Sequence, residues 1–278
     1  MTMRAALQRQ QGFTLIEMVM VIVILGIVGT MVAVFMRAPV TAYFDTARRA
    51  ALTDVADTTV RRMARDIRKA LPNSLQTPVT VPANQCVEFI PTRTGGRYRA
   101  DVDAGVVGAQ AASILAINTP DTRFNMLGNN ANLPADQQIQ VLDWIAVYNL
   151  GIAGANAYAG DNTSVVRGVV NGAETAITID STTFPLASGG NRFHVIPFTE
   201  PVVAYVCNGG NLRRSVRAFA AASCPATGAI LARNVGNCNF VYNGSDLQRN
   251  ALVRLTVEFT DTGETVSLYH EVHVNNTP

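Results

Sequence analysis

Charged residues are scarce in this chain, and the motifs of common enzyme classes are missing. Only 15% of the 278 residues are Asp, Glu, Lys or Arg, and the formal net charge is +2. A nucleic-acid-binding protein would show a basic patch or stripe, which this sequence lacks. It also lacks Gly-x-Ser-x-Gly, His-Glu-x-x-His and phosphate-binding Gly-Lys-Ser/Thr motifs. We therefore predict a protein that is not an enzyme and has neither a cofactor nor a nucleic-acid partner.

Residues that bind metals are also few and poorly spaced. The histidines are His194, His270 and His273, and they complete no zinc site of ordinary ligand spacing with the cysteines. Residues 101–105 (Asp-Val-Asp-Ala-Gly) have the acidic alternation of a calcium loop but lack its third acid and its distal Glu. We predict no metal site; zinc at the cysteines and calcium at 101–105 are the alternatives.

Two of the histidines lie on one predicted strand and face opposite ways. His270 is two residues from both Leu268 and Val272, so it shares their apolar strand face and we expect it to face the core. His273 shares the other strand face with Tyr269, and we predict that this face is simply polar. A binding site on it is the alternative.

One long apolar run lies near the N-terminus, and Glu17 is its only charge. It extends over 24 residues, from Phe13 to Met36. A helix of that length spans ~36 Å, at about 1.5 Å per residue, and can cross a bilayer. A secretory signal peptide has a shorter apolar core followed by a small-residue cleavage site. We predict that residues 13–36 form a transmembrane helix.

Residues 1–12 form a short polar leader that contains Arg4 and Arg9 and no acidic residue. The positive-inside rule therefore places the N-terminus in the cytoplasm and the rest of the chain on the other side. Removing the leader takes away two of the 22 basic side chains and leaves 20 against 20 acidic ones. An ordinary single-span anchor is the alternative. Glu17 weighs against it, because a carboxylate on a lipid-facing helix is costly and usually functional.

The run continues into a second helical segment, residues 37–72. Pro39 removes a backbone hydrogen bond, so we expect a kink or break there. From residue 40 to 71, apolar residues recur every three or four positions in a narrow stripe, and the other positions are largely charged. The stripe predicts an amphipathic helical spine that ends at Pro72.

In residues 73–278, apolar and polar residues alternate with a period of two. This pattern predicts a β-rich globular domain. The predicted strands are 86–90, 113–117, 139–148, 165–170, 176–180, 193–196, 202–207, 212–216, 239–242, 252–259 and 265–274. The clearest hairpin turns at 261–263. We expect surface loops at 100–112 and 150–164. The fold class predicted is α+β, with the long helix packed on an antiparallel sheet.

The four cysteines, Cys86, Cys207, Cys224 and Cys238, all follow the membrane segment, and none forms a Cys-x-x-Cys pair. An even number in a domain exported across a membrane favours two disulfides, for which there are three pairings. Cys207 and Cys224 flank a predicted hairpin at 208–210. Our leading hypothesis joins these two and leaves Cys86 with Cys238.

Residues 12–17, Gly-Phe-Thr-Leu-Ile-Glu, resemble the processing motif of type IV pilins and pseudopilins. The resemblance implies that a prepilin peptidase cuts after Gly12 and methylates the new amine of Phe13. The helix then remains on the mature protein. Family members share a fold in which a long N-terminal helix packs on an antiparallel sheet. We expect Glu17 to act in assembly, by pairing with the α-amine of a Phe13.

Further segments resemble MshO-type minor pilins of the mannose-sensitive haemagglutinin (MSHA) pilus system. They are residues 39–45, 48–50, 61–68, 70–74, 143–149 and 268–278. This resemblance implies a minor pilin that copolymerises through its N-terminal helix and acts in initiation or at the filament tip. J-type minor pseudopilins of type II secretion are an alternative, since they share the Arg-Asp-x-Arg-x-Ala-Leu-Pro pattern at 65–72. A tip adhesin that binds a surface or glycan ligand, through loops such as 150–164, is another.

The implied partners are prepilin peptidase and other major and minor pilins. The implied location is the bacterial inner membrane, crossed once with the C-terminal domain in the periplasm, and then the pilus.

We predict that the mature protein begins at methylated Phe13 and keeps its apolar helix. N-terminal mass spectrometry of protein from native membranes measures this. Cleavage after the apolar run, near Ala38, would instead identify an ordinary signal peptide.

Overall fold

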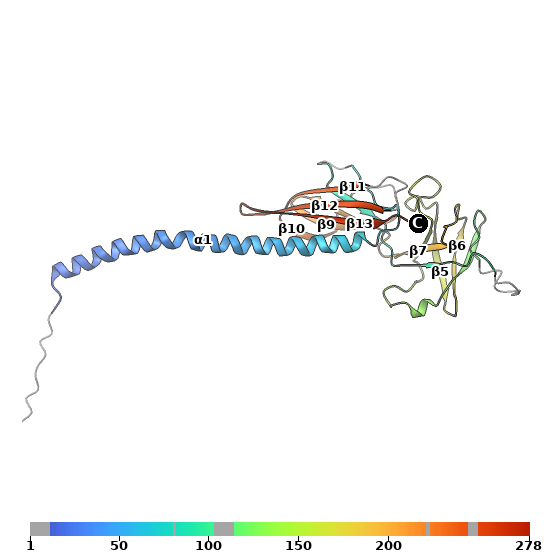
Figure 1. Cartoon of the computed structure of the whole chain (residues 1–278), viewed down its shortest axis with the longest axis horizontal. Helices are drawn as coiled ribbons and strands as arrows, with labels where there is room; N and C mark the ends of the chain where they lie inside the picture. The colour runs from blue at the N-terminus through green and yellow to red at the C-terminus, as the bar shows by residue number, and fades with distance from the viewer. Residues whose placement is uncertain (1–11, 80–81, 103–113, 221–222, 244–249) are drawn as a thin grey trace, which may run out of the picture. The chain divides into compact units, whose positions relative to one another are not determined.

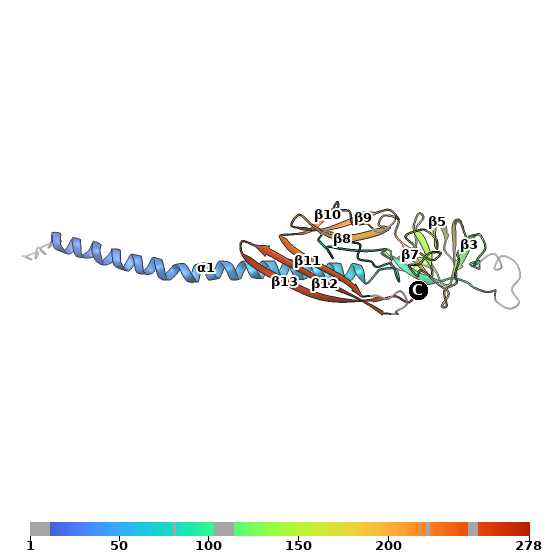
Figure 2. The same cartoon turned by 90° about the horizontal axis from the view of Figure 1, so that it is seen from above.

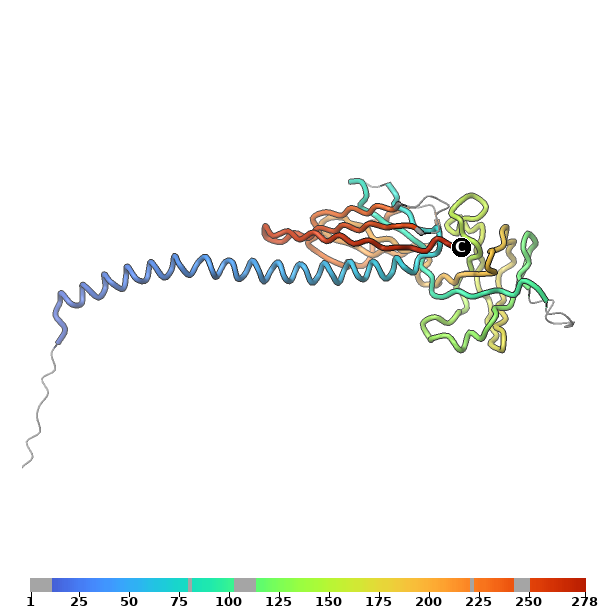
Figure 3. Tube along the Cα trace, viewed as in Figure 1, coloured from blue at the N-terminus to red at the C-terminus, as the bar shows by residue number. Residues whose placement is uncertain are grey.

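The computed structural model describes residues 12–79, 82–102, 114–220, 223–243 and 250–278 (Figure 3). The leader before Gly12 and three residues of the calcium-like segment, 103–105, lie outside the described residues. The chain forms two compact units, Met1–Ala51 and Leu52–Pro278.

The first unit is made of the N-terminal part of helix α1, which extends over 53 residues from Leu15 to Ile67. The helix continues through Pro39, so the break that the sequence predicted there is wrong. The kink stays a prediction. The Thr41 hydroxyl donates to the carbonyl oxygens of Arg37 and Ala38, at 3.0 and 2.9 Å, which adds side-chain hydrogen bonds to the turn next to the proline. One missing backbone bond does not end a helix of this length.

The second unit begins with the C-terminal part of α1, which carries a buried stripe. Its buried residues are Leu52, Ala56, Thr59, Val60, Met63, Ala64 and Ile67, spaced for one helix face. The helix ends at Ile67, before the predicted end at residue 71. There the Leu71 N–H donates to the Ile90 oxygen at 2.7 Å, and Pro72 cannot continue a helix.

All the strand pairs that the structure describes are antiparallel, and they form three sheets (Figures 1 and 2). The first has the order β1 (Cys86–Phe89), β8 (Val202–Asn208), β9 (Asn211–Arg217), β10 (Ala229–Arg233). The second has β11 (Val235–Asn243), β12 (Asn250–Asp261), β13 (Glu264–Asn275). The third has β2 (Thr94–Arg97), β7 (Arg192–Ile196), β4 (Trp144–Val147), β5 (Thr163–Val170), β6 (Thr175–Thr182), β3 (Asp121–Met126). The predicted α+β fold class is confirmed.

The helix-packed lobe consists of residues 52–67 of α1 with the first two sheets. Figures 1 and 2 show these strands alongside the last turns of α1. One continuous core joins Met63 and Ile67 of the helix to Phe89, Tyr205 and Leu255 of the strands. Burying a large apolar side chain contributes about 1.5–3 kcal/mol, so this core is what holds the helix end to the sheets.

The third sheet forms a second lobe, the six-stranded lobe, with a core of its own. Phe124 and Phe193 pack there edge to face, with ring centroids 5.3 Å apart. The sequence predicted one β-domain and missed β2 and β3 of this lobe, and also β10 of the first sheet. The predicted strand at 113–117 is wrong, because residues 114–117 contribute only an isolated bridge from Ile117 to Phe184.

Three asparagines hold the two lobes and the C-terminal segment together. The Asn73 N–H donates to Asn276 Oδ1 at 3.2 Å, and its Nδ2 donates to the Asn149 carbonyl at 2.9 Å. Asn149 Nδ2 donates back to the Pro72 oxygen at 2.7 Å. Asn73 has a φ of 57°, a left-handed conformation that asparagine tolerates better than most residues.

The structure has the two predicted disulfides and no free cysteine, but their pairing differs from our hypothesis. The bonds are Cys86–Cys224 and Cys207–Cys238. Strand alternation explains the difference. Cys207 shares the inner face of β8 with Tyr205, next to Cys238 in the core. Cys86 lies on the outer face, opposite Val206, where the chain after β9 returns with Cys224.

We expect non-reducing peptide mapping to recover one peptide pair that links Cys86 to Cys224 and another that links Cys207 to Cys238. The same digest after reduction is the control and should yield four separate peptides. Serine at both Cys86 and Cys224 should lower the free energy of unfolding by about 2–5 kcal/mol. A Cys207–Cys224 peptide would contradict the structure.

Candidate functional site

The processing junction lies just before α1. Gly12, Phe13 and Thr14 precede the helix, and all three are exposed. A Cβ at Gly12 would have no other atom within 4 Å, and Phe13 is 85% exposed. The Gly12–Phe13 peptide bond therefore stands clear of the rest of the described chain.

Thr14 and Glu17 form a capping box at the start of α1. Glu17 Oε2 accepts hydrogen bonds from the Thr14 N–H at 3.1 Å and from its hydroxyl at 3.2 Å. The Glu17 N–H donates to Thr14 Oγ1 at 3.3 Å. These reciprocal bonds occupy backbone donors that a helix start otherwise leaves unpaired. Our sequence analysis missed this box, although Thr-x-x-Glu before an apolar run is its signature.

The capping box gives the Glu17 carboxylate hydrogen-bond partners within its own chain. This carboxylate has local hydrogen-bond donors and lies at the positive end of the helix dipole, so it has stabilising contacts before any partner arrives. Both bonds go to Oε2, and the described residues place no hydrogen bond on Oε1. One carboxylate oxygen is thus left for another donor.

The first part of α1 presents apolar side chains on every side. Val34 and Phe35 are 73% and 80% exposed, and none of the most apolar window is buried against the chain. By length and composition, α1 can cross a membrane. Thr30, a polar residue inside this run, donates its hydroxyl to the Gly26 and Ile27 carbonyls, so its hydrogen-bonding group is satisfied within the helix.

One of the three histidines lies in β7, and the other two lie on opposite faces of β13. His270 is half-buried on the inward face of β13, and His273 is exposed on the other face with Tyr269, as the alternation predicted. His194 lies in β7, where burial lowers its pKa to about 4 and keeps the ring neutral at physiological pH. All four cysteines are in disulfides, which leaves none to bind zinc. Within the described residues, no group of three His, Cys, Asp or Glu is placed to hold a metal.

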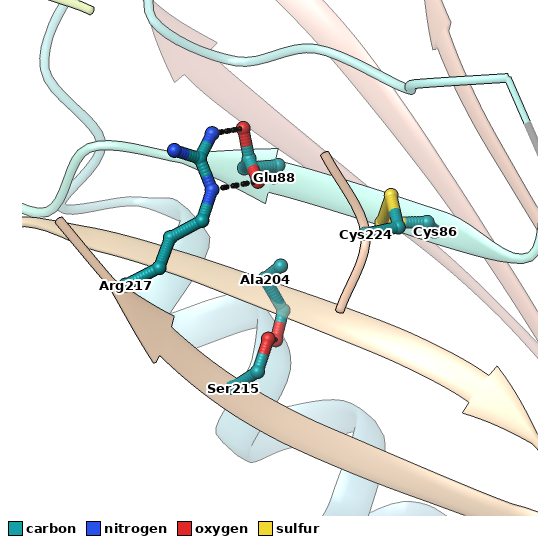
Figure 4. The surroundings of a disulfide bond; sticks show 6 residues. All are labelled: Cys86, Glu88, Ala204, Ser215, Arg217 and Cys224. Atoms are coloured by element: carbon teal, nitrogen blue, oxygen red, sulfur yellow. Dashed lines mark hydrogen bonds and ion pairs between the residues drawn. A yellow bond between two sulfur atoms is a disulfide. The ribbon is translucent and has the colours of Figure 1, made fainter. Parts of the chain in front are cut away.

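A buried ion pair lies beside the Cys86–Cys224 disulfide (Figure 4). Arg217, at the end of β9, reaches Glu88 of β1, with Nε 2.9 Å from Oε2. The Glu88 side chain is fully buried, and burial raises its pKa while the Arg217 contacts oppose the change. Arg217 also donates to the Ala218 and Ala220 carbonyls. The pair and the disulfide hold the chain after β9 against the outer face of the sheet.

Comparison with known proteins gives one match. The family model described as the prokaryotic N-terminal methylation motif matches residues 7–33, which contain the processing junction, the capping box and most of the apolar run. No curated protein and no solved structure among those compared matches the chain.

The motif, the apolar helix and the antiparallel domain together support a type IV pilin or pseudopilin, a structural protein. The motif implies processing by prepilin peptidase and assembly with other pilins. With the long apolar helix, it fits anchoring in a membrane.

Replacing Thr14 with Val keeps the side-chain shape and removes the hydroxyl of the capping box. The Glu17 amide then loses its acceptor, and loss of a cap costs about 0.5–2 kcal/mol. We expect several-fold faster hydrogen exchange at the Glu17 amide of the full chain in detergent micelles. Thr30→Val is the matched control and should leave that amide unchanged. Equal exchange in Thr14→Val and wild type would rule out the box.

Proposed function

We propose that this protein is a minor pilin of an MSHA-type (type IV) pilus, which copolymerises through its N-terminal helix and acts in initiation or at the tip. The observation that carries the proposal is the start of α1. An exposed Gly12–Phe13 junction opens directly into an apolar helix of membrane-spanning length, with Glu17 as its only charge. The MshO-like segments of the sequence support the narrower identity.

Processing follows from this arrangement. Prepilin peptidase cuts after Gly12, methylates the α-amine of Phe13 and leaves the helix on the protein, which crosses the inner membrane once. Residues 73–278 then lie in the periplasm and later in the pilus. The two disulfides agree with an oxidising compartment of that kind.

Glu17 is the assembly residue in this proposal. A carboxylate in lipid is costly as an ion unless it is paired. The capping box occupies Oε2 and leaves Oε1 to accept from the α-amine that cleavage creates, either its own or that of a subunit already in the filament. Pairing replaces two costly charges with one neutral pair, and it sets the axial position of the incoming subunit.

A position at an end of the filament is supported by the six-stranded lobe. Its core contains no residue of α1, so the lobe adds bulk beyond the sheets that pack on the helix. A subunit repeated along a filament must fit such bulk between its neighbours, whereas a terminal subunit has a free side.

The pseudopilin alternative rests on the pattern at 65–72, and the structure gives part of this pattern a packing role. Asp66 accepts from the Tyr205 hydroxyl at 2.6 Å and from Arg214 Nε at 3.1 Å, which ties the helix to β8 and β9.

Deletion of the gene distinguishes the three candidate functions. Loss of piliation supports the pilus role, loss of protein secretion supports the pseudopilin role, and normal filaments with lost adhesion support the adhesin.

The charge-pairing mechanism is tested by Glu17→Gln, which keeps the capping box because glutamine also serves at that position. We expect normal cleavage and membrane insertion. Recovery in filaments, or in crosslinks to other pilins, should fall about tenfold or more, since breaking a buried ion pair costs ~3–5 kcal/mol. Quantitative immunoblots of membrane and filament fractions measure both steps.

Thr14→Val is the control, because it removes the hydroxyl bonds of the box and keeps the charge of Glu17. It should assemble better than Glu17→Gln. If the Gln variant assembles as well as wild type, charge pairing is wrong; if Thr14→Val loses as much, capping accounts for the effect.

A further inference from the structure

A groove runs between α1 and the edge of the second sheet, within the unit that begins at Leu52. Its volume is ≈ 630 Å³. Residues of α1 line one side and residues of β13 the other: Asp57, Thr58, Val60, Arg61, Ala64, Arg65, Arg68, Leu268, Tyr269 and His270. Apolar side chains such as Val60 and Leu268 supply part of the lining, and arginines supply most of its charge.

The β13 side of this groove is an open sheet edge. In the order β11-β12-β13, β13 pairs with β12 through twelve residues without a register shift, and no other described strand pairs with it. Proteins usually protect an edge of this length with a bulge, a proline or charged side chains, lysine above all. β13 has no bulge, proline or lysine, and its exposed Glu271 is paired with Arg254 of β12. The edge is therefore available for another strand.

The hairpin geometry identifies which backbone groups point outward. Thr262 and Gly263 form a two-residue turn with positive φ, so Asp261 and Glu264 are the hydrogen-bonded pair that closes it. Because such pairs alternate along an antiparallel ladder, the odd-numbered residues of β13 direct their N–H and C=O away from β12. Ser267 and Tyr269 are among them, and their N–H groups have no backbone acceptor among the described residues.

The α1 side of the groove is positively charged. Arg61 is paired with Asp57 at 2.8 Å, but Arg65 and Arg68 are exposed and form no ion pair in the described part of the chain. The spacing of 61, 65 and 68 puts the three arginines on one helix face. Among the described residues that line the groove, Asp57 is the only acidic one, and it is paired with Arg61.

We propose that this groove binds an extended acidic segment of a partner protein, which adds to β13 as a further strand. The backbone of the segment would pair with the outward N–H and C=O groups of residues such as Ser267 and Tyr269. Alternate side chains of a strand are ~6.6–6.8 Å apart, and the unpaired arginines, Arg65 and Arg68, are ~4.5 Å apart along the helix. The arginine side chains are long enough to cover this difference of about 2 Å, so two carboxylates at alternate positions of the added strand can each reach one of them. This inference does not depend on the pilin function proposed above.

The charge requirement is tested with the full chain in detergent micelles and a fluorescein-labelled peptide of five Thr-Glu repeats. We expect saturable binding by fluorescence anisotropy, weaker at high salt, and about tenfold weaker binding of a Thr-Gln peptide. Arg65→Glu with Arg68→Glu should abolish binding of the acidic probe. Arg62→Glu is the matched control, since Arg62 is exposed on α1 but does not line the groove, and it should bind as wild type does.

The strand requirement is tested with Ser267→Pro, which removes one outward N–H and leaves the bonds to β12. Binding should fall at least several-fold, whereas Ser267→Ala should bind as wild type does. Thiol titration checks that both disulfides are intact in each variant. A probe N-methylated at its threonines makes the same test without altering the protein and should also bind weakly.

Two results would overturn the proposal. The first is unchanged binding of the N-methylated probe, which would show that the peptide does not add as a strand. The second is a DNA oligonucleotide of equal charge that binds as tightly as the peptide and is insensitive to Ser267→Pro. The groove would then be a general polyanion site.

Discussion

The structure of the helix-packed lobe depends on the burial of one helix stripe. Met63 and Ile67 are fully buried against strands of two sheets, and residues on the opposite helix face are charged and exposed. The stripe joins the cores of the two sheets into one, and the Cys207–Cys238 disulfide adds a direct link between β8 and β11. The Asp66–Tyr205 and Asp66–Arg214 bonds then orient the helix end, but the apolar contacts provide the larger stabilisation.

One helix therefore serves two environments. Up to Met36 its side chains are apolar on all faces, which suits lipid or the packed helices of an assembly. From Leu52 it has a single apolar face, which suits a sheet on one side and water on the other. Glu17 and Thr14 begin this helix with a closed set of hydrogen bonds, so the only charged side chain in the apolar part also has a structural role. Any functional study of Glu17 has to separate that role from its charge.

The sequence allowed the helix, the final hairpin and the fold class to be predicted, because each gives a periodic signal that is local. The capping box also has a local sequence signal, Thr-x-x-Glu, but it was overlooked. The disulfide pairing was not predictable, since it depends on which face of β1 and β8 each cysteine occupies and on the return of the chain after Arg217. The burial of Glu88 was also not predictable, because its ion-pair partner, Arg217, lies on a strand 129 residues away in the sequence. β2 was missed because its two glycines usually interrupt strands; here they allow close contact with Phe193.

The strand order of the first sheet has a consequence for how the chain is built. β1 and β8 are neighbours in that sheet, with Phe89 opposite Val203, yet the whole six-stranded lobe lies between them in the sequence. The lobe is thus an insertion whose two ends are held side by side by a backbone ladder. The Cys86–Cys224 disulfide closes the covalent ring around it, with 138 residues of separation. A single cut in any of its loops would leave both pieces joined. The same architecture lets the inserted lobe change in size or sequence while the helix, the sheets and the disulfides that carry it stay as they are.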